Sequence, residues 1–118
     1  MPSVKTVKIG DQDIRFLADA KTCVYYFSTF KRDLFRDIQK MQTDEGIDVM
    51  LIQQLAYIMA AQGSGGLRNL SYENYLDWLG QFDAFDVINQ ANEIVSIYAG
   101  QRTATAKPKK KEGQQSGS

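Results

Sequence analysis

Histidine is absent from this chain of 118 residues, and cysteine occurs once, at Cys23. Without histidine, the commonest general base and the commonest metal ligand are both missing. A lone cysteine excludes an intrachain disulfide and, without histidine, a cysteine–histidine catalytic dyad. A single thiol also suits a reducing cytoplasm. We therefore expect no enzymatic activity, no cofactor and no metal site, and we expect Cys23 to pack as a small apolar side chain.

Long hydrophobic runs are absent as well. No apolar stretch approaches the ~18 residues of a transmembrane helix, and the chain does not open with the charged and apolar regions of a signal peptide. We therefore expect neither membrane insertion nor secretion. The length, the apolar content of 43% and the charged content of 24% are ordinary for one globular domain.

Charge is distributed unevenly, although the formal net charge is zero. Residues 102–118 carry five basic side chains and one acidic side chain (+4), whereas residues 1–101 carry nine basic and thirteen acidic side chains (−4). After residue 101 the sequence has no periodicity and little apolar content. These features predict a single domain over residues 1–101 and a disordered basic tail over residues 102–118. The tail contains the run KPKKK, for which both a solvated tail and contact with nucleic acid or an acidic partner stay open.

The first structural pattern is a β-hairpin over residues 4–16. Val7, Ile9, Ile14 and Phe16 alternate with polar side chains, and Gly10-Asp11 between them fits a type II′ turn, whose first residue needs a positive φ. A two-stranded sheet alone is marginal in water. The apolar side of the hairpin is therefore expected to cover helices.

Helical periodicity dominates the rest of the chain and predicts about four to five helices, so the expected fold class is α+β and mainly α. Capping residues mark the expected helix starts, and glycines mark three of the ends. The expected starts are Asp19 or Thr22, Asp33, Asp48, Ser71 and Asp83, and the expected ends are Gly63–Gly66, Gly80 and Gly100. The expected apolar faces are Val24, Phe27 and Phe30; Leu34, Ile38 and Met41; and Leu51, Leu55, Ile58 and Met59, with Gln53, Gln54 and Gln62 off the last face.

The longest amphipathic pattern covers residues 82–100, and the rest of the domain is expected to pack against this closing helix. Its apolar arc spans roughly 180°, wider than the ~100° stripe of an ordinary surface helix. Ile97 falls within the polar arc. The pattern predicts apolar surface beyond what one copy can bury, with Ile94, Ile97, Tyr98 and, from the preceding helix, Trp78 as partner-binding residues. On this interpretation, Ile97→Asp leaves the fold intact and weakens binding.

Two other motifs have both a functional and a structural interpretation. Asp83 and Asp86, with Asp77 a turn upstream, could form an acid–base or divalent-cation site, but their position favours helix capping. The glycine-rich stretch 63–66 resembles a phosphate-binding loop, but it lacks the Gly-Lys-Ser/Thr ending and follows a helix rather than a strand. A flexible linker between helices is the better interpretation.

The aromatic residues near the first helices could stack on single-stranded nucleic acid. Basic residues interleave with them only at Lys31 and Arg32, and the body of the chain is acidic. Core packing and protein contacts therefore account for them better. The set comprises Tyr25, Tyr26, Phe27, Phe30 and Phe35.

Four segments in this order resemble the tail assembly chaperones of siphophages, in particular the group common in phages of Gram-positive bacteria. The resemblance covers about residues 4–100. The segments are the hairpin, VYYFSTFKRDLFRDIQKM (24–41), LAYIMAAQ (55–62) and SYENYLDWLGQFDAFDVINQANEIVSIYAG (71–100). Residues that match the family pattern are Phe30, Arg32, Asp33 and Leu34; Leu55, Ala56, Tyr57, Met59 and Ala60; and Ser71, Tyr72, Glu73, Tyr75 and Leu76. Lys31 departs from a usual glycine, and Phe27 from a common basic residue, which puts the turn geometry in question.

The resemblance implies a small, mostly helical protein without enzymatic activity, working in the host cell cytoplasm. Such proteins coat the tape measure protein, keep its long apolar helices soluble, help recruit tail tube subunits and leave before the virion is complete. Many also exist in a longer form made by a programmed ribosomal frameshift near the end of the shorter reading frame, where Lys109, Lys110 and Lys111 lie here. The implied partners are therefore the tape measure protein, the tail tube protein, the longer form and further copies of the chain, without a membrane or nucleic acid.

Two alternative functions stay open. The basic tail could serve a small nucleic-acid-binding or regulatory protein, and binding would then be lost on deletion of residues 102–118 and would depend steeply on salt. A minor head–tail connector of the virion is the nearest structural alternative, and its presence in purified particles would distinguish it.

Overall fold

A β-hairpin begins the fold, as the alternating pattern predicts. In this computed structural model, β1 (Ser3–Ile9) pairs antiparallel with β2 (Gln12–Ala18), with Val7 opposite Ile14 and Ile9 opposite Gln12. The two-residue turn contains Gly10 at φ 60°, a positive value that glycine adopts without strain. Val7, Ile9 and Phe16 are buried, so the apolar side of the hairpin covers the helices as expected.

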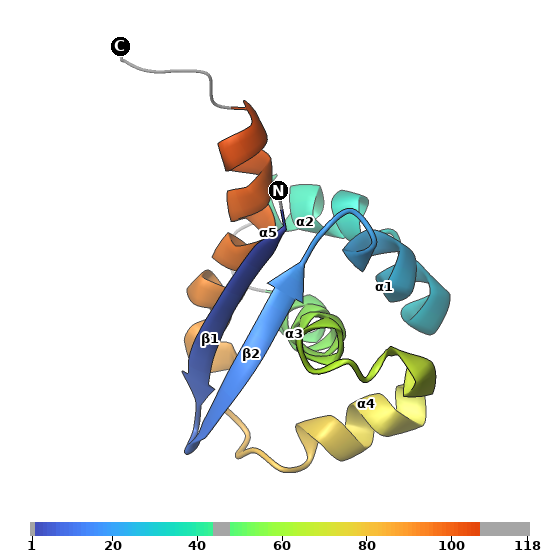
Figure 1. Cartoon of the computed structure of the whole chain (residues 1–118), viewed down its shortest axis with the longest axis vertical. Coiled ribbons are helices and arrows are strands. Elements are labelled where there is room, and N and C mark those ends of the chain that lie inside the picture. Colours follow the sequence, from blue (N-terminus) through green and yellow to red (C-terminus); the bar gives the residue numbers. More distant parts are fainter. Residues whose placement is uncertain (1, 44–47, 107–118) are drawn as a thin grey trace.

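In the part of the chain that the structure describes, five α-helices and two short 3₁₀ helices follow the hairpin (Figure 1). The structure describes residues 2–43 and 48–106, with side chains at residues 2–41 and 48–100. The predicted class, α+β and mainly α with an N-terminal hairpin, is confirmed. The helices are α1 (Thr22–Phe30), α2 (Leu34–Thr43), α3 (Val49–Ser64), η1 (Leu67–Asn69), α4 (Tyr72–Leu79), η2 (Ile88–Gln90) and α5 (Ala91–Ala106).

The central element is α3, and not the closing helix that the sequence favours. Figure 1 looks along α3, with the hairpin, α1, α4 and α5 arranged around it, and each of these elements contacts it. From Leu51 to Gly63, every residue except Gln53 is buried. The expectation that Gln54 and Gln62 lie off the apolar face is therefore wrong. A helix surrounded on all sides has no polar face, so its sequence does not show an amphipathic period.

Buried glutamines of α3 also decide which face of α1 turns inward. Thr22 and Tyr26 are fully buried, because the Thr22 hydroxyl donates to Gln62 Oε1 (2.7 Å) and the Tyr26 hydroxyl donates to Gln54 Oε1 (3.3 Å). The predicted apolar face is thus wrong in two positions, since Val24 and Phe27 are 60% and 57% exposed. Buried hydroxyl groups with partners cost little, so the polar bonds outweigh the burial of two apolar side chains.

Three of the predicted caps are confirmed. The side chains of Asp33, Asp48 and Ser71 accept hydrogen bonds from the backbone N–H groups of Arg36, Leu51 and Asn74, at 3.0–3.2 Å. The cap predicted for α1 is wrong, because Lys21 occupies the N-cap position without a side-chain bond. Asp19 and Thr22 instead bond within the turn that precedes the helix: the Asp19 N–H donates to the Thr22 hydroxyl, and the Lys21 N–H donates to Asp19.

The segment predicted as one helix over residues 82–100 is divided. Residues 84–87 form a turn, η2 follows, and α5 begins only at Ala91. Asp83 and Asp86 hold the turn, because the Asp83 N–H donates to the Asp86 carboxylate at 2.9 Å. The prediction that Gly100 ends the helix is also wrong, because α5 continues to Ala106. The disorder predicted for the tail over residues 102–118 is wrong for residues 102–106, because they belong to α5, while residues 107–118 lie outside the described residues.

The exposure expected for Ile97 is wrong as well. Ile97 is 5% exposed and belongs to the core, as does Ile94 at 0%. The α5 helix packs against both strands, and the Lys5 ammonium pairs with the Glu93 carboxylate across the seam with β1. The hairpin therefore covers the surface that the sequence assigns to a partner.

Candidate functional site

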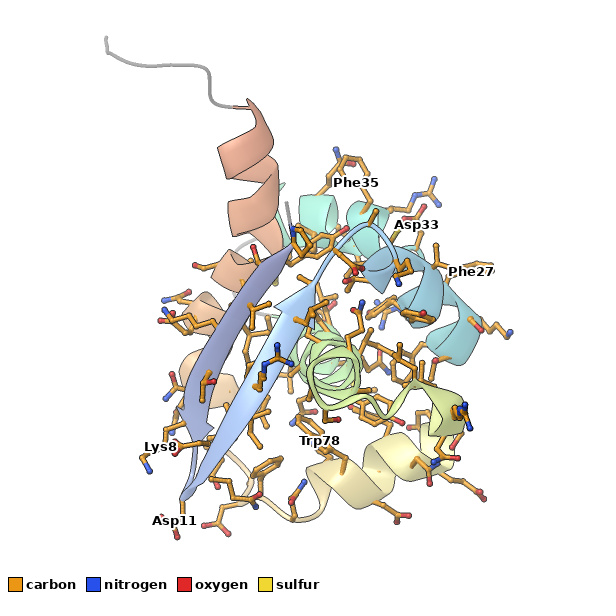
Figure 2. The ribbon with its side chains drawn as sticks, in the orientation of Figure 1. Lys8, Asp11, Phe27, Asp33, Phe35 and Trp78 are labelled. Atoms are coloured by element: carbon orange, nitrogen blue, oxygen red, sulfur yellow. The ribbon has the colours of Figure 1, made fainter. Side chains whose placement is uncertain are left out.

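A pocket of ≈ 920 Å³ opens between β2, α3, α4 and the link that joins the two helices. Figure 2 shows Trp78 extending from α4 toward α3 at this place. The volume lies within the range of small-ligand and side-chain binding sites. The lining residues are Asp13, Ile14, Arg15, Tyr57, Ala60, Ala61, Gly63, Ser64, Gly66, Asn69, Asn74 and Trp78.

Small residues of α3 and an aromatic pair, Tyr57 of α3 and Trp78 of α4, give the pocket its shape. Ala60 and Ala61 are the small residues on the α3 side, and Gly63 lies where the backbone of Arg15 approaches the helix. The rings of Tyr57 and Trp78 lie with their centroids 5.9 Å apart and form an aromatic wall. α3 ends at Ser64, and Gly65, at φ 81°, takes the left-handed conformation that turns the chain away toward α4. Gly63 and Ser64 thus belong to α3, and Gly65 and Gly66 begin the link to α4, so the predicted linker starts two residues later than expected.

Arg15 supplies an unbalanced positive charge at this pocket. Its Nη1 donates to the carbonyl oxygen of Gly63 at 2.5 Å, and no carboxylate in the described part of the chain pairs with its guanidinium. The other charged residue in the lining, Asp13, has Lys8 at 3.8 Å. The acidic neighbour is therefore partly compensated, whereas Arg15 is available to an anionic partner.

An aromatic cluster stiffens the pocket wall from behind. Phe30 of α1 lies with its ring centroid 5.1 Å from that of Tyr75, and Tyr75 lies 5.6 Å from Tyr57. Burial raises the pKa of Tyr75 to about 12 and also raises the pKa of Tyr57. Both phenols therefore stay neutral at physiological pH, Tyr57 in the pocket lining and Tyr75 behind it.

A second polar cluster ties the helices together without forming a site. The fully buried Tyr26 has its hydroxyl near Gln54 and near the carboxylate of Asp37, which in turn pairs with Arg32 at 2.9 Å. Burial is the main cause that raises the pKa of Tyr26. Because every partner belongs to α1, α2, α3 or their links, this cluster fixes the helices relative to one another.

Four other exposed apolar side chains belong to α1 and α4, and we call them together the α1–α4 face: Val24, Phe27, Tyr72 and Leu76. These side chains are 47–60% exposed. Phe30 links the two helices below this face, because its ring centroid lies 6.4 Å from that of Tyr72. Figure 2 shows Phe27 on the outer side of α1. The four residues of this face are all apolar or aromatic, whereas the pocket lining includes the charged residues Asp13 and Arg15.

The structure separates the residues predicted to bind a partner. Trp78 borders the pocket, whereas Ile94 and Ile97 are buried and Tyr98 is half-buried on α5. None of the three α5 residues lines the pocket. Sequence reasoning missed Arg15 and Gly63, because their roles depend on the approach of α3 to β2. Alternation in β2 could only have placed Arg15 on the side of the strand opposite to Phe16.

Within residues 2–43 and 48–106, no group of three or more histidine, cysteine, aspartate or glutamate side chains is placed to hold a metal ion. In the same part of the chain, no helix has both the length and the hydropathy needed to cross a bilayer.

Comparisons with known proteins add no relative. The chain matches no protein-family model, no curated protein and no solved structure.

Proposed function

We propose that this protein is a tail assembly chaperone of a siphophage, which binds the tape measure protein in the host cell cytoplasm and keeps its apolar helices soluble. In this proposal it also helps recruit tail tube subunits and leaves before the virion is complete. The proposal rests on the ordered resemblance over residues 24–41, 55–62 and 71–100. It also rests on one observation from the structure, the α1–α4 face.

The α1–α4 face supports the proposal by its location and its exposure. Its four residues come from the first and third of these segments, and their exposed fractions of 47–60% leave much of each side chain uncovered. A client helix with an apolar stripe buries such side chains by laying the stripe along them. Phe27 replaces a residue that is often basic in the family, which makes this face more apolar in the present chain.

The proposed client-binding surface therefore differs from the one expected from the sequence, which was on the closing helix. The closing helix cannot offer Ile94 and Ile97 to a client, because both are in the core. Trp78 is half-buried and lines the pocket. The α1–α4 face takes the place of α5 as the client-binding surface.

The test is co-expression of the full chain with the tape measure protein, followed by affinity capture of the chaperone. We expect the wild-type chain to keep the tape measure protein soluble and to capture it. Phe27→Asp and Leu76→Asp should each reduce the captured amount at least about tenfold, because a charge opposite an apolar stripe is costly to desolvate.

Met50→Asp is the matched control. Met50 is 44% exposed and lies in the first turn of α3, at the opposite end of that helix from its link to α4, where an added carboxylate suits the helix dipole. We expect this variant to capture as much tape measure protein as the wild type. No capture by the wild-type chain, or equal losses in all three variants, would reject the proposal.

The longer form is a separate part of the proposal and has its own test. Slippage at Lys109–Lys111 needs an adenine-rich slippery heptamer in the gene. Codons there that contain no such heptamer would remove the frameshifted form from the proposal and leave the chaperone function in place.

A further inference from the structure

We infer that the pocket between β2, α3 and α4 receives Phe85 of a second copy of this chain. The inference extends the self-association included in the proposed function by naming both sides of the contact. It concerns a surface separate from the α1–α4 face, so that each can fail without the other.

Phe85 is the most exposed large apolar side chain in the described part of the chain, at 71%. It stands on the turn of residues 84–87, and this turn is well braced. The Asp83 N–H donates to the Asp86 carboxylate at 2.9 Å, and the Asn89 N–H donates to the carbonyl oxygen of Phe85 at 2.8 Å. A braced, exposed aromatic side chain loses little conformational freedom on docking, which favours its use as an anchor.

The pocket offers a matching environment for this ring. Its volume of ≈ 920 Å³ exceeds that of a phenyl group, and Trp78, Tyr57 and the α3 alanines line it. Aromatic rings pack favourably edge to face, as Trp78 already does with Phe82 of its own chain at 5.1 Å. Phe85 does not line the pocket of its own chain.

Charge complementarity selects this occupant over a basic client helix. Arg15 in the pocket lining has no carboxylate partner in the described part of the chain. Asp83, two residues before Phe85, is exposed, and its carboxylate likewise makes no ion pair with a described residue. Asp13, the other charged residue of the lining, has Lys8 at 3.8 Å. Docking of Phe85 brings an unpaired carboxylate toward the unpaired guanidinium of Arg15, whereas a basic helix would bring like charges together there.

The two sides of the contact are different surfaces, so the association is heterologous: each copy uses its Phe85 on one neighbour and its pocket on another. This asymmetry allows a complementation experiment with two variants of the full chain. Phe85→Asp removes the anchor and keeps the pocket. Ser64→Phe fills the pocket at an exposed lining residue and keeps the anchor.

Sedimentation velocity over a series of concentrations measures the result. We expect the wild type to self-associate, each variant alone to associate at least about tenfold more weakly, and an equimolar mixture of the two variants to recover a one-to-one dimer. Trp78 is the sole tryptophan of the chain, so its emission should shift in the wild type and in the mixture and stay constant in each variant alone. Asp83→Asn should weaken association several-fold and reduce its dependence on salt.

Met50→Asp and Ser28→Phe are the matched controls for the two substitutions, at exposed positions outside the pocket and the turn. Both should associate like the wild type. A monomeric wild type at all concentrations, association that survives Phe85→Asp and Ser64→Phe, or a mixture that does not recover the dimer would each overturn the inference. Capture of the tape measure protein by a chain that stays monomeric would overturn it and leave the proposed function intact.

Discussion

The α-carbon of Gly63 in α3 lies directly against the carbonyl group of Arg15 in β2. A Cβ atom at residue 63 would stand 2.0 Å from the Arg15 oxygen, closer than real atoms approach. The Arg15 side chain closes the same contact by donating to the Gly63 carbonyl oxygen. The central helix therefore approaches the outer edge of the hairpin with no side chain between them, which covers backbone groups of an edge strand.

This relationship predicts that Gly63→Ala destabilises the protein by about 2 kcal/mol or more, because backbone must move to admit the methyl group. Helix propensity alone predicts the opposite sign, since alanine favours a helix by about 1 kcal/mol over glycine. Gly100→Ala is the control, because Gly100 lies within α5 with open space around its Cβ direction. This substitution should stabilise the protein by about 0.5–1 kcal/mol. Denaturant unfolding measures both. If both variants changed the free energy of unfolding in the same direction, the close contact between Gly63 and Arg15 would be contradicted.

Lys31 ends α1 in the left-handed conformation, at φ 58° and ψ 38°, and is the one non-glycine residue with a positive φ in the described part of the chain. The turn thus keeps a geometry suited to glycine, although the chain carries lysine at this position. A lysine there bears strain of about 1–2 kcal/mol, partly offset by the lower entropy of its unfolded state. We expect Lys31→Gly to raise the free energy of unfolding by about 0.5–1 kcal/mol.

Gly65→Ala provides the converse measurement, because Gly65 has φ 81° with no atom near its Cβ direction. It should lower the free energy of unfolding by about 1 kcal/mol through backbone strain alone. If Lys31→Gly is destabilising while Gly65→Ala behaves as expected, the conformation assigned to Lys31 is wrong.

Ile97→Asp should now act on folding and not on binding. Ile97 is 5% exposed between α5 and the hairpin, so an aspartate there would be buried without a partner. We expect a loss of about 3 kcal/mol or more in thermal or denaturant unfolding. Ser96→Asp, on the exposed neighbouring position, should change stability by less than about 0.5 kcal/mol. A fully stable Ile97→Asp variant would restore the partner-binding interpretation of this residue.

Stability should fall steeply above pH 10. Burial raises the pKa of Tyr75 from 10.0 to about 12 and raises the pKa values of Tyr57 and Tyr26. Above pH 10 the unfolded chain therefore binds fewer protons than the folded chain, and the free energy of unfolding falls by up to ~1.4 kcal/mol per pH unit for each such tyrosine. Below pH 10 these groups contribute no pH dependence.

Denaturant unfolding from neutral pH to pH 12 measures this slope, and Tyr75→Phe should make it shallower by the contribution of one proton. Tyrosinate absorbance provides the direct readout, because six tyrosines are present and the buried ones should ionise only as the protein unfolds. Ionisation of all six near pH 10 in the folded protein would contradict the burial of these phenols.

The parts of the fold that follow from local chemistry could be predicted from the sequence. The hairpin depends on alternation and a two-residue turn. The caps at Asp33, Asp48 and Ser71 depend on hydrogen bonds between residues three positions apart in the sequence. These signals lie within a few residues of each other, so no tertiary contact is needed to recognise them.

The parts that depend on tertiary contacts could not be predicted. The inward face of α1 is chosen by bonds from Thr22 and Tyr26 to glutamines 40 and 28 positions away in α3. Periodicity favoured Val24 and Phe27, because it scores hydrophobicity and ignores available partners. The same limit affects the candidate site: Trp78 was recognisable as a large aromatic residue, whereas Arg15 and Gly63 matter only because α3 meets β2.

The enclosed position of α3 has a consequence for how the protein opens. Amide hydrogens between Leu51 and Gly63 meet solvent only when the surrounding layers separate, so their exchange with deuterium should be the slowest in the chain and should report complete unfolding. Separation of any one neighbouring element would expose buried residues of α3 to water. The protein is therefore expected to unfold in a single cooperative transition.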